Sequence, residues 1–471
     1  MVFLKCLIRP RTTRKNSKKS WQCDAVRPGP VKNVSAIYTG EVAEVKELQR
    51  KRSGATAWTE DLSGTININI PYIISTRKKI TAVIFIILSV RKTQNTGGYM
   101  TSKKRMLTAM CNAIPDRVPV APDMSNMIPC KRTGLPFWDI YLFEKVPLWK
   151  AYIDAVRHFG FDGWLAGLGS GIWPEDAGSE WREAIVKQTP ERIYTRRFRE
   201  NGKREWTHEC TVYYRDNPPS DQIALDKVGL SNDDPQSWIE VERSARSVAD
   251  LLPEVRSSMG ESGIVGLDVW LPGLDIKHPE QVFEYYDDRD TFLKKCAADH
   301  KRIMRRLAYA LSLKPDFILI GISGHMISNP PEIFRELSLP TLKAITRACK
   351  DADIPSQIHC CGPEKELVTI AAEESDLSSI NPLEIPPMGN CTLADVKKNW
   401  GAKVSLMGNL HTTDVMLHGS RDEVFTASRK AMDDAAAGGG FILSTGDQCG
   451  RDTPDENIFA MIEAVEQFGK Y

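Results

Sequence analysis

The sequence lacks the features that mark a membrane protein or a nucleic-acid-binding protein. Its 62 Lys and Arg residues nearly balance its 61 Asp and Glu residues over 471 positions, so no net charge attracts polyanions. Its longest apolar run, residues 80–90, is too short for a spanning helix, which needs roughly 20 apolar residues. We therefore expect no membrane segment and no nucleic-acid partner.

The chain also lacks a regular cysteine framework and a signal-peptide core near its start. Its 11 cysteines are irregularly spaced and odd in number, unlike those of a disulfide-stapled secreted domain. The apolar run at 80–90 lies too far from the N-terminus to direct secretion. We expect a cytoplasmic protein whose thiols are reduced and free to bind a metal or to react.

Residues 1–99 differ from the remainder of the chain. The first 20 residues include seven basic side chains and no acidic one, and no helical or strand period continues for long. This stretch is interpreted either as a transit peptide or as translated upstream sequence. The second interpretation rests on Met100. A plausible first helix begins at Met100, and the codons of the residues just before it can contain a ribosome-binding sequence. We expect residues 1–99 to be poorly ordered and to carry no site.

From Met100 onward, an apolar strand, a short loop and an N-capped helix recur. The helix starts carry a capping residue with an acid three positions later, as in Ser420-Arg-Asp-Glu423. Alternating strands and helices indicate a parallel sheet, and eight strands indicate a (β/α)8 TIM barrel over residues 100–471. The predicted strands are residues 118–121, 161–165, 264–270, 317–321, 355–359, 377–384, 404–409 and 440–446.

Residues 173 to about 260 interrupt this repeat. Two strand-like arms, residues 192–199 and 204–214, flank an Asn201-Gly202 turn, which is the signature of a β-hairpin. We interpret the segment as an inserted lid over the barrel mouth.

The tripeptide His359-Cys360-Cys361 closes one predicted strand. Alternate residues of a strand point to the same side, so His359 and Cys361 can bind one zinc ion while Cys360 faces away. The alternative is a small buried cysteine beside a hydrogen-bonded histidine. Because barrel active sites lie at the carboxyl ends of the strands, other polar residues in that position become candidates. They are Asp123, His325, Glu384, Asn409, His411, Asp447 and Cys449.

Each of these candidates also has a structural alternative. Glu384 can cap a loop or pair with a lysine, and Asp447 can cap the turn of the final helix. His325 and His411 can serve as structural hydrogen-bonding groups.

The order His-x-Cys, Glu384, Cys449 on separate strands resembles the zinc site of cobalamin-independent methionine synthases. From about Met100 the chain resembles the uroporphyrinogen decarboxylase superfamily, and within it the corrinoid-dependent methyltransferase branch (methylcobamide:coenzyme M methyltransferase-like). This resemblance implies a (β/α)8 barrel and a zinc ion that lowers the pKa of a substrate thiol. The segments that carry it are 116–120, 359–362, 381–384, 408–409 and 445–458.

The sequence departs from these relatives in two places. The methyltransferases place a zinc cysteine directly after the glycine of the last strand, where this chain has Asp447, with Cys449 two residues later. The third ligand is therefore Cys449, Asp447 or neither. The decarboxylases carry an arginine-rich segment where this chain has residues 122–127 without arginine, which argues against a substrate with eight carboxylates.

These patterns predict a zinc-dependent methyltransferase that moves a methyl group between a protein-bound corrinoid and a thiol or tetrahydrofolate-like acceptor. One alternative is a metal-free decarboxylase of a tetrapyrrole, in which Asp123 or Asp447 stabilises a protonated pyrrole. Another is a non-catalytic corrinoid- or tetrapyrrole-binding barrel. The predicted roles are metal ligands (His359, Cys361, Cys449, Glu384), catalytic groups (Asp447, Glu384) and substrate contacts (Asp123, His325, Asn409, His411).

Overall fold

The computed structural model describes residues 99–471 apart from residues 170, 244, 245 and 276. The chain divides into two units, Met1–Gln94 and Asn95–Tyr471, and the second contains the described residues. The expectations for residues 1–98, including the apolar run at 80–90, lie outside the described residues. Within the described part, no helix combines the length and apolar character needed to cross a membrane.

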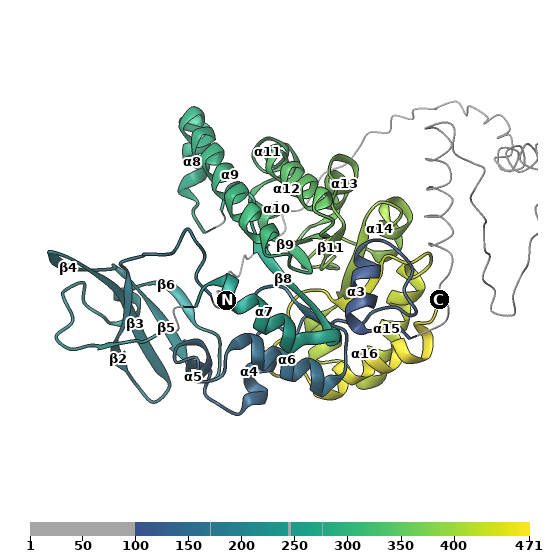
Figure 1. The fold of residues 1–471 in the computed structure, drawn as a ribbon, viewed down its shortest axis with the longest axis horizontal. Helices are drawn as coiled ribbons and strands as arrows, with labels where there is room; N and C mark the ends of the chain where they lie inside the picture. Colours follow the sequence, from purple (N-terminus) through teal and green to yellow (C-terminus); the bar gives the residue numbers. More distant parts are fainter. Residues whose placement is uncertain (1–98, 170, 244–245, 276) are drawn as a thin grey trace, which may run out of the picture. The chain divides into compact units, whose positions relative to one another are not determined.

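One curled sheet of seven parallel strands forms the centre of this unit, with neighbours in the order β1-β8-β9-β10-β11-β12-β13 (Figure 1). Each of these strands lies within or largely overlaps a predicted strand. Their bounds are β1 Gly163–Leu165, β8 Gly263–Val269, β9 Phe317–Gly321, β10 Ser356–His359, β11 Ser379–Asn381, β12 Ser405–Leu410 and β13 Phe441–Thr445.

The eighth predicted strand, residues 118–121, is a single parallel bridge between Val120 and Leu443 rather than a full strand. It nevertheless contacts both edges of the sheet. The Ala121 amide donates to the Leu443 carbonyl of β13 at 2.9 Å, and the Asp162 amide, next to β1, donates to the Val120 carbonyl at 2.8 Å. The sheet with this segment is TIM-barrel-like.

Helices connect the successive strands and surround the sheet (Figure 1). Helix α15 begins with the predicted capping box, in which Ser420 and Glu423 satisfy each other's backbone N–H groups. The helix bounds are α3 Ser102–Met110, α4 Met127–Thr133, α5 Phe137–Tyr141, α6 Leu148–Phe159, α7 Val248–Met259, α8 Glu280–Asp287, α9 Arg289–Ser312, α10 His325–Ser328, α11 Pro331–Leu337, α12 Leu339–Asp351, α13 Lys365–Glu374, α14 Leu393–Trp400, α15 Arg421–Ala435 and α16 Asp455–Phe468.

Helix α3 covers the amino-terminal end of the barrel. Its side chains Met106 and Met110 are fully buried in a cluster with Trp164, Ile264 and Phe317, which occupy the first or second position of their strands. The barrel is therefore closed at this end by packed apolar side chains. The carboxyl ends of the strands are left for a site.

The start of α3 provides the basis for a test of the N-terminal extension. The backbone N of Met100 donates to Asp116 Oδ2 at 2.9 Å, and Arg105 donates to the Met100 carbonyl at 2.7 Å. In a protein shortened to begin at Met100, the new α-ammonium group can make the Asp116 contact as a charge-assisted bond. We expect its thermal unfolding midpoint to lie within about 3 °C of that of the full chain, as measured by circular dichroism. A much larger loss would show that residues 1–99 support the fold.

The inserted segment forms a six-stranded antiparallel sheet in the order β6-β5-β3-β2-β7, with β4 paired to β3. The predicted hairpin is confirmed: Asn201 pairs with Lys203, and Gly202 adopts a φ of +71° that favours glycine. Its second arm is broken at Thr207 and His208 into β4 and β5. The strands are β2 Arg182–Gln188, β3 Arg192–Asn201, β4 Lys203–Trp206, β5 Glu209–Tyr214, β6 Ser220–Ala224 and β7 Ile239–Glu240.

The turn between β5 and β6 links this sheet to the barrel loops. The Arg215 carbonyl accepts from the Phe137 amide at 2.7 Å, and the Asp216 carbonyl accepts from Arg451 Nη1 at 2.5 Å. Arg451 follows β13, so one contact reaches the loop after the last barrel strand. These contacts come from the β5–β6 turn and not from the Asn201-Gly202 tip, and the lid role of the tip stays a prediction.

Candidate metal centre

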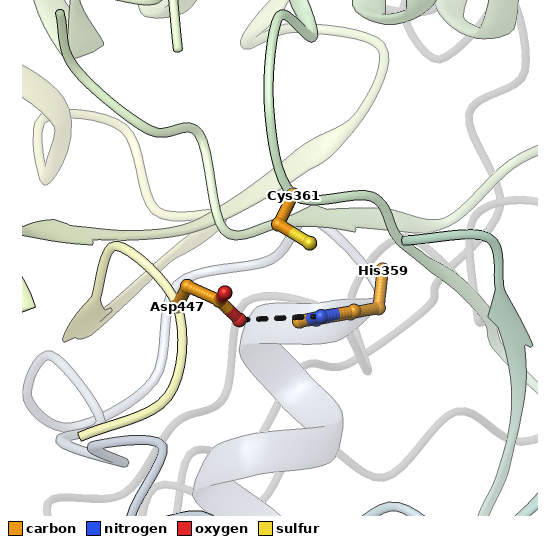
Figure 2. Close-up of side chains that lie close together, drawn as sticks. All are labelled: His359, Cys361 and Asp447. Carbon is orange, nitrogen blue, oxygen red and sulfur yellow. Dashed lines mark ion pairs between the residues drawn. The ribbon is translucent and has the colours of Figure 1, made fainter. Parts of the chain in front are cut away.

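Three side chains of metal-binding type converge at the carboxyl ends of two barrel strands (Figure 2). His359 ends β10, Cys361 follows it by two residues, and Asp447 follows the end of β13. One ligand atom from each lies within 4.8 Å of the other two, and His359 Nε2 is 3.5 Å from Asp447 Oδ1. Tetrahedral zinc with bonds of about 2.1 Å places neighbouring ligand atoms about 3.4 Å apart, so this pair has the separation that zinc requires.

The alternation of β10 explains which cysteine joins the cluster. Cys360 is fully buried in the main hydrophobic core, whereas Cys361 is only partly buried and lies beside His359 and Asp447. Burial, reinforced by the charge of Asp447, raises the pKa of the Cys361 thiol to about 11. A metal ion that binds here must therefore displace a proton from this thiol.

Asp447 reaches the cluster through an unusual backbone conformation. Its φ of +107° is one that residues other than glycine rarely adopt and that typically costs about 1–3 kcal/mol. The Thr445 hydroxyl donates to the Asp447 carbonyl at 2.8 Å and supports this turn. The chain therefore leaves the extended conformation directly after β13, and the Asp447 carboxylate faces His359.

Asn381 lies beside Nδ1, the ring nitrogen of His359 that does not face Asp447. Asn381 Nδ2 lies 3.2 Å from His359 Nδ1, and Asn381 Oδ1 is buried without a hydrogen-bond partner among the described residues. Turning the amide over lets Oδ1 accept from an Nδ1–H group, which satisfies both residues. This arrangement leaves Nε2 as the nitrogen available to a metal, as is usual for metal-bound histidine.

Asp123 lies beside the cluster. Its carboxylate accepts from the Ser125 amide at 2.8 Å, and its carbonyl accepts from the Cys449 amide at 2.8 Å. Burial raises the pKa of Asp123 and the nearby His359 opposes this effect, while Asp447 adds to it. The charges of His359 and Asp447 thus both act on this carboxyl group.

Glu384 is close to Cys361 but lies outside the cluster. Its Oε2 accepts from the backbone N–H of Gly362 at 2.5 Å. Burial raises the pKa of Glu384, and the Gly362 hydrogen bond opposes that effect. Asn409 also acts on this loop, because its Nδ2 donates to the Leu383 carbonyl at 2.9 Å. The structure thus places Glu384 and Asn409 in contact with backbone groups; their roles as ligand, catalytic group or substrate contact stay predictions.

The two remaining histidine candidates are engaged in local hydrogen bonds. His325 Nε2 lies 2.8 Å from the Ser338 hydroxyl, and burial lowers the pKa of His325 to about 4. His411 Nδ1 accepts from the Asp414 amide at 2.9 Å and caps the π-helical turn η4, Thr412–Leu417. Their assignment as substrate contacts stays a prediction.

Cys449 lies in the hydrophobic core rather than in the cluster. It is fully buried, and burial, with a smaller effect of Asp123, raises the pKa of its thiol to about 12. Of the two third-ligand candidates from the sequence, the structure brings Asp447, not Cys449, to His359 and Cys361.

Cys449→Ala separates these two candidates. We expect the variant to lose about 1–2 kcal/mol of unfolding free energy, because a buried sulfur is deleted from the core. Its zinc affinity should stay within about threefold of the wild-type value. Urea unfolding and a chelator competition titration measure the two quantities. A loss of zinc affinity at unchanged stability would return Cys449 to the ligand set.

The sequence reading missed two residues that support the cluster. Asn381 lies within the motif Asn381-Pro-Leu-Glu384, at the end of a predicted strand, but is not among the predicted site residues. Glu364 is not among them either, yet it is fully buried and burial raises its pKa well above the usual range. A glutamate three residues after a ligand cysteine, at the first turn of a core helix, was the available signal.

A separate polar cavity of about 450 Å³ lies between the inserted sheet and the segment around α5. At one wall Glu183 accepts hydrogen bonds from Thr195, Tyr213 and Arg243. These groups satisfy one another, which is typical of a structural junction between two packed elements.

The comparisons with known proteins agree with this architecture. Residues 322–468, from the end of β9 through α16, match the family model described as uroporphyrinogen decarboxylase (URO-D). Residues 322–468 are thus similar to the uroporphyrinogen decarboxylase superfamily, as the sequence resemblance predicted. The matched part of the chain contains His359, Cys361 and Asp447.

Two individual proteins that the chain is similar to are methyltransferases. It is 27% identical over 139 residues to the methylcobamide:CoM methyltransferase MtbA of Methanosarcina mazei, a match that covers 29% of this chain and 37% of that relative. The match thus spans just over a third of the length of that relative. A solved methyltransferase from Methanosarcina mazei shares the fold, with a TM-score of 0.51 at 16% identity over 78% of this chain and 99% of that one. A B12-independent methionine synthase from Listeria monocytogenes gives a TM-score of 0.33 at 13% identity, over 49% and 72% of the two chains.

Proposed function

We propose that this protein is a zinc-dependent methyltransferase that moves a methyl group between a corrinoid, carried on a partner protein, and a thiol or tetrahydrofolate-like acceptor. The observation that carries the proposal is the convergence of His359, Cys361 and Asp447 at the carboxyl ends of the barrel strands. The similarity to a methylcobamide:CoM methyltransferase supports the choice of reaction. We place the protein in the cytoplasm, where its thiols stay reduced.

The donor set of the cluster fits zinc. Imidazole, thiolate and carboxylate are all zinc ligands, and three protein ligands leave a fourth position for a substrate, as in catalytic zinc sites. Bound there, zinc would supply Lewis acidity that lowers the pKa of a substrate thiol, so that the sulfur is a thiolate at neutral pH. In this proposal Asp447 takes the place that the sequence reading offered to Cys449 or Glu384.

The neighbouring residues would orient the ligands and handle the proton. Asn381 would hold the Nδ1 side of His359, and Asp123 would accept the proton that the substrate thiol loses. When the methyl group passes from a corrinoid to the thiolate, a sulfur electron pair forms the new carbon–sulfur bond. The two electrons of the broken carbon–cobalt bond remain on cobalt.

The proposal is tested with the purified full chain before and after removal of metal by a chelator. We expect about one zinc per chain, and transfer from free methylcobalamin to coenzyme M or to tetrahydrofolate that zinc restores. Loss of the methyl–cobalt absorbance follows the reaction. A protein that binds no zinc and transfers no methyl group would favour the tetrapyrrole decarboxylase or the non-catalytic corrinoid-binding barrel, and release of CO2 from a tetrapyrrole substrate would distinguish these two.

A further inference from the structure

The turn that follows β11 is held by one side chain from β12 and one from the start of α13. Leu383 has a φ of +60°, a conformation that a branched side chain rarely adopts without support. Its carbonyl accepts from Asn409 on β12, and its N–H donates to Glu364 Oε2 at 2.5 Å.

Glu364 is an unusual residue to find in this position. It is fully buried at the start of α13, and its second oxygen, Oε1, has no hydrogen-bond partner among the described residues. A buried carboxyl group with an unsatisfied oxygen is unfavourable for folding. Packing alone does not explain it, since an apolar side chain would fill the space without that penalty.

Glu384 completes a reciprocal pair of contacts. Glu364 accepts from the backbone N–H of Leu383, next to Glu384, and Glu384 Oε2 accepts from the backbone N–H of Gly362, two residues before Glu364. Gly362 follows Cys361 directly. The two carboxyl groups thus tie the end of β10, which carries the thiol, to the end of β11.

We infer that Glu364 is a positioning residue for the metal centre, because it holds the 381–384 turn and, through Glu384 and Gly362, fixes Cys361 relative to His359 and Asp447. The inference rests on the proposed function for the identity of the metal. The crossed contacts themselves do not depend on it.

Three variants test the role of Glu364. Glu364→Gln keeps the length of the side chain and an oxygen that can accept from Leu383, and Glu364→Leu removes this hydrogen bond. Glu366→Gln changes an exposed carboxylate on the same helix that accepts a hydrogen bond from Asn390, and it serves as the matched control. Zinc affinity is measured by chelator competition, and the thiolate-to-metal band of the cobalt(II)-substituted protein reports the geometry at Cys361.

We expect at least about a tenfold loss of zinc affinity and a weakened cobalt–thiolate band in Glu364→Leu. Glu364→Gln and Glu366→Gln should stay within about threefold of wild type. A folded Glu364→Leu protein with wild-type affinity and spectrum would overturn the inference. If that variant does not fold, Glu364→Asp replaces it, because the shorter side chain cannot reach Leu383, and wild-type behaviour of Glu364→Asp would overturn the inference equally.

A metal-free readout separates this inference from the proposed function. If the wild-type protein binds neither zinc nor cobalt, the proposed function fails, and the rate of Cys361 alkylation by iodoacetamide decides the role of Glu364. We expect alkylation at least about fivefold faster in Glu364→Leu or Glu364→Asp, because the strand end is released, and unchanged in Glu364→Gln. Equal rates in all variants would reject the role.

Discussion

Cys361→Ser is expected to lower zinc affinity by more than about a hundredfold, since losing even an outer partner of a ligand costs 10–100-fold. Cys361 is the one thiol in the His359, Cys361 and Asp447 cluster, and a serine hydroxyl does not ionise at neutral pH. A competition titration with a chromophoric chelator measures the change. Full zinc retention in this variant would end the zinc hypothesis.

Cys360→Ser is the matched control for this experiment. The two cysteines are adjacent, but Cys360 points into the hydrophobic core and away from the cluster. We expect Cys360→Ser to keep zinc affinity within about threefold of wild type while losing stability, because a hydroxyl replaces a buried thiol. Opposite effects of two neighbouring substitutions would isolate the metal site from the packing of the strand.

The pH dependence of zinc binding gives an independent check on Cys361. Its pKa in the metal-free protein is raised to about 11, so the thiol carries a proton at every pH below that value. Zinc binding therefore releases this proton, which contributes about a tenfold rise in affinity for each unit increase in pH. Cys361→Ser should reduce the slope of log affinity against pH by one proton.

The alternation of side chains along β10 was predictable because strand period needs no knowledge of tertiary structure. It assigned His359 and Cys361 to one side and Cys360 to the other before any contact was known. The arrangement after β13 was not predictable, since it depends on the φ of +107° at Asp447. An extended chain would have placed Asp447 and Cys449 on the same face, and the turn separates them.

The polar residues at other strand ends show a second limit of sequence reading. Glu384, His325 and His411 sit where barrel active sites are built, yet each has a local hydrogen-bond partner. Buried backbone groups must be satisfied, and strand ends have many of them. Sequence position alone does not separate a side chain that faces a substrate from one that satisfies the backbone.

Asp447 stands at the position where the sequence resemblance implies a zinc-binding cysteine. Asp447→Asn keeps the size of the side chain and removes its charge, so we expect zinc affinity to fall by roughly 10–100-fold. Asp447→Cys supplies the softer ligand that zinc favours, and we expect affinity to rise by about tenfold or more. Both values come from the same chelator competition, with Cys449→Ala as the variant that should change neither.

The direction of these two changes decides what completes the metal centre. If zinc affinity falls in Asp447→Asn and rises in Asp447→Cys, position 447 provides the third ligand. The carboxylate then makes the native site a weaker zinc binder than a site with two thiolates. Unchanged affinity in both variants would remove Asp447 from the ligand set. The third ligand would then be Glu384. Its carboxylate would have to leave the backbone N–H of Gly362, to which it is hydrogen-bonded. Glu384→Gln would then lower zinc affinity, whereas Asp447→Asn would not.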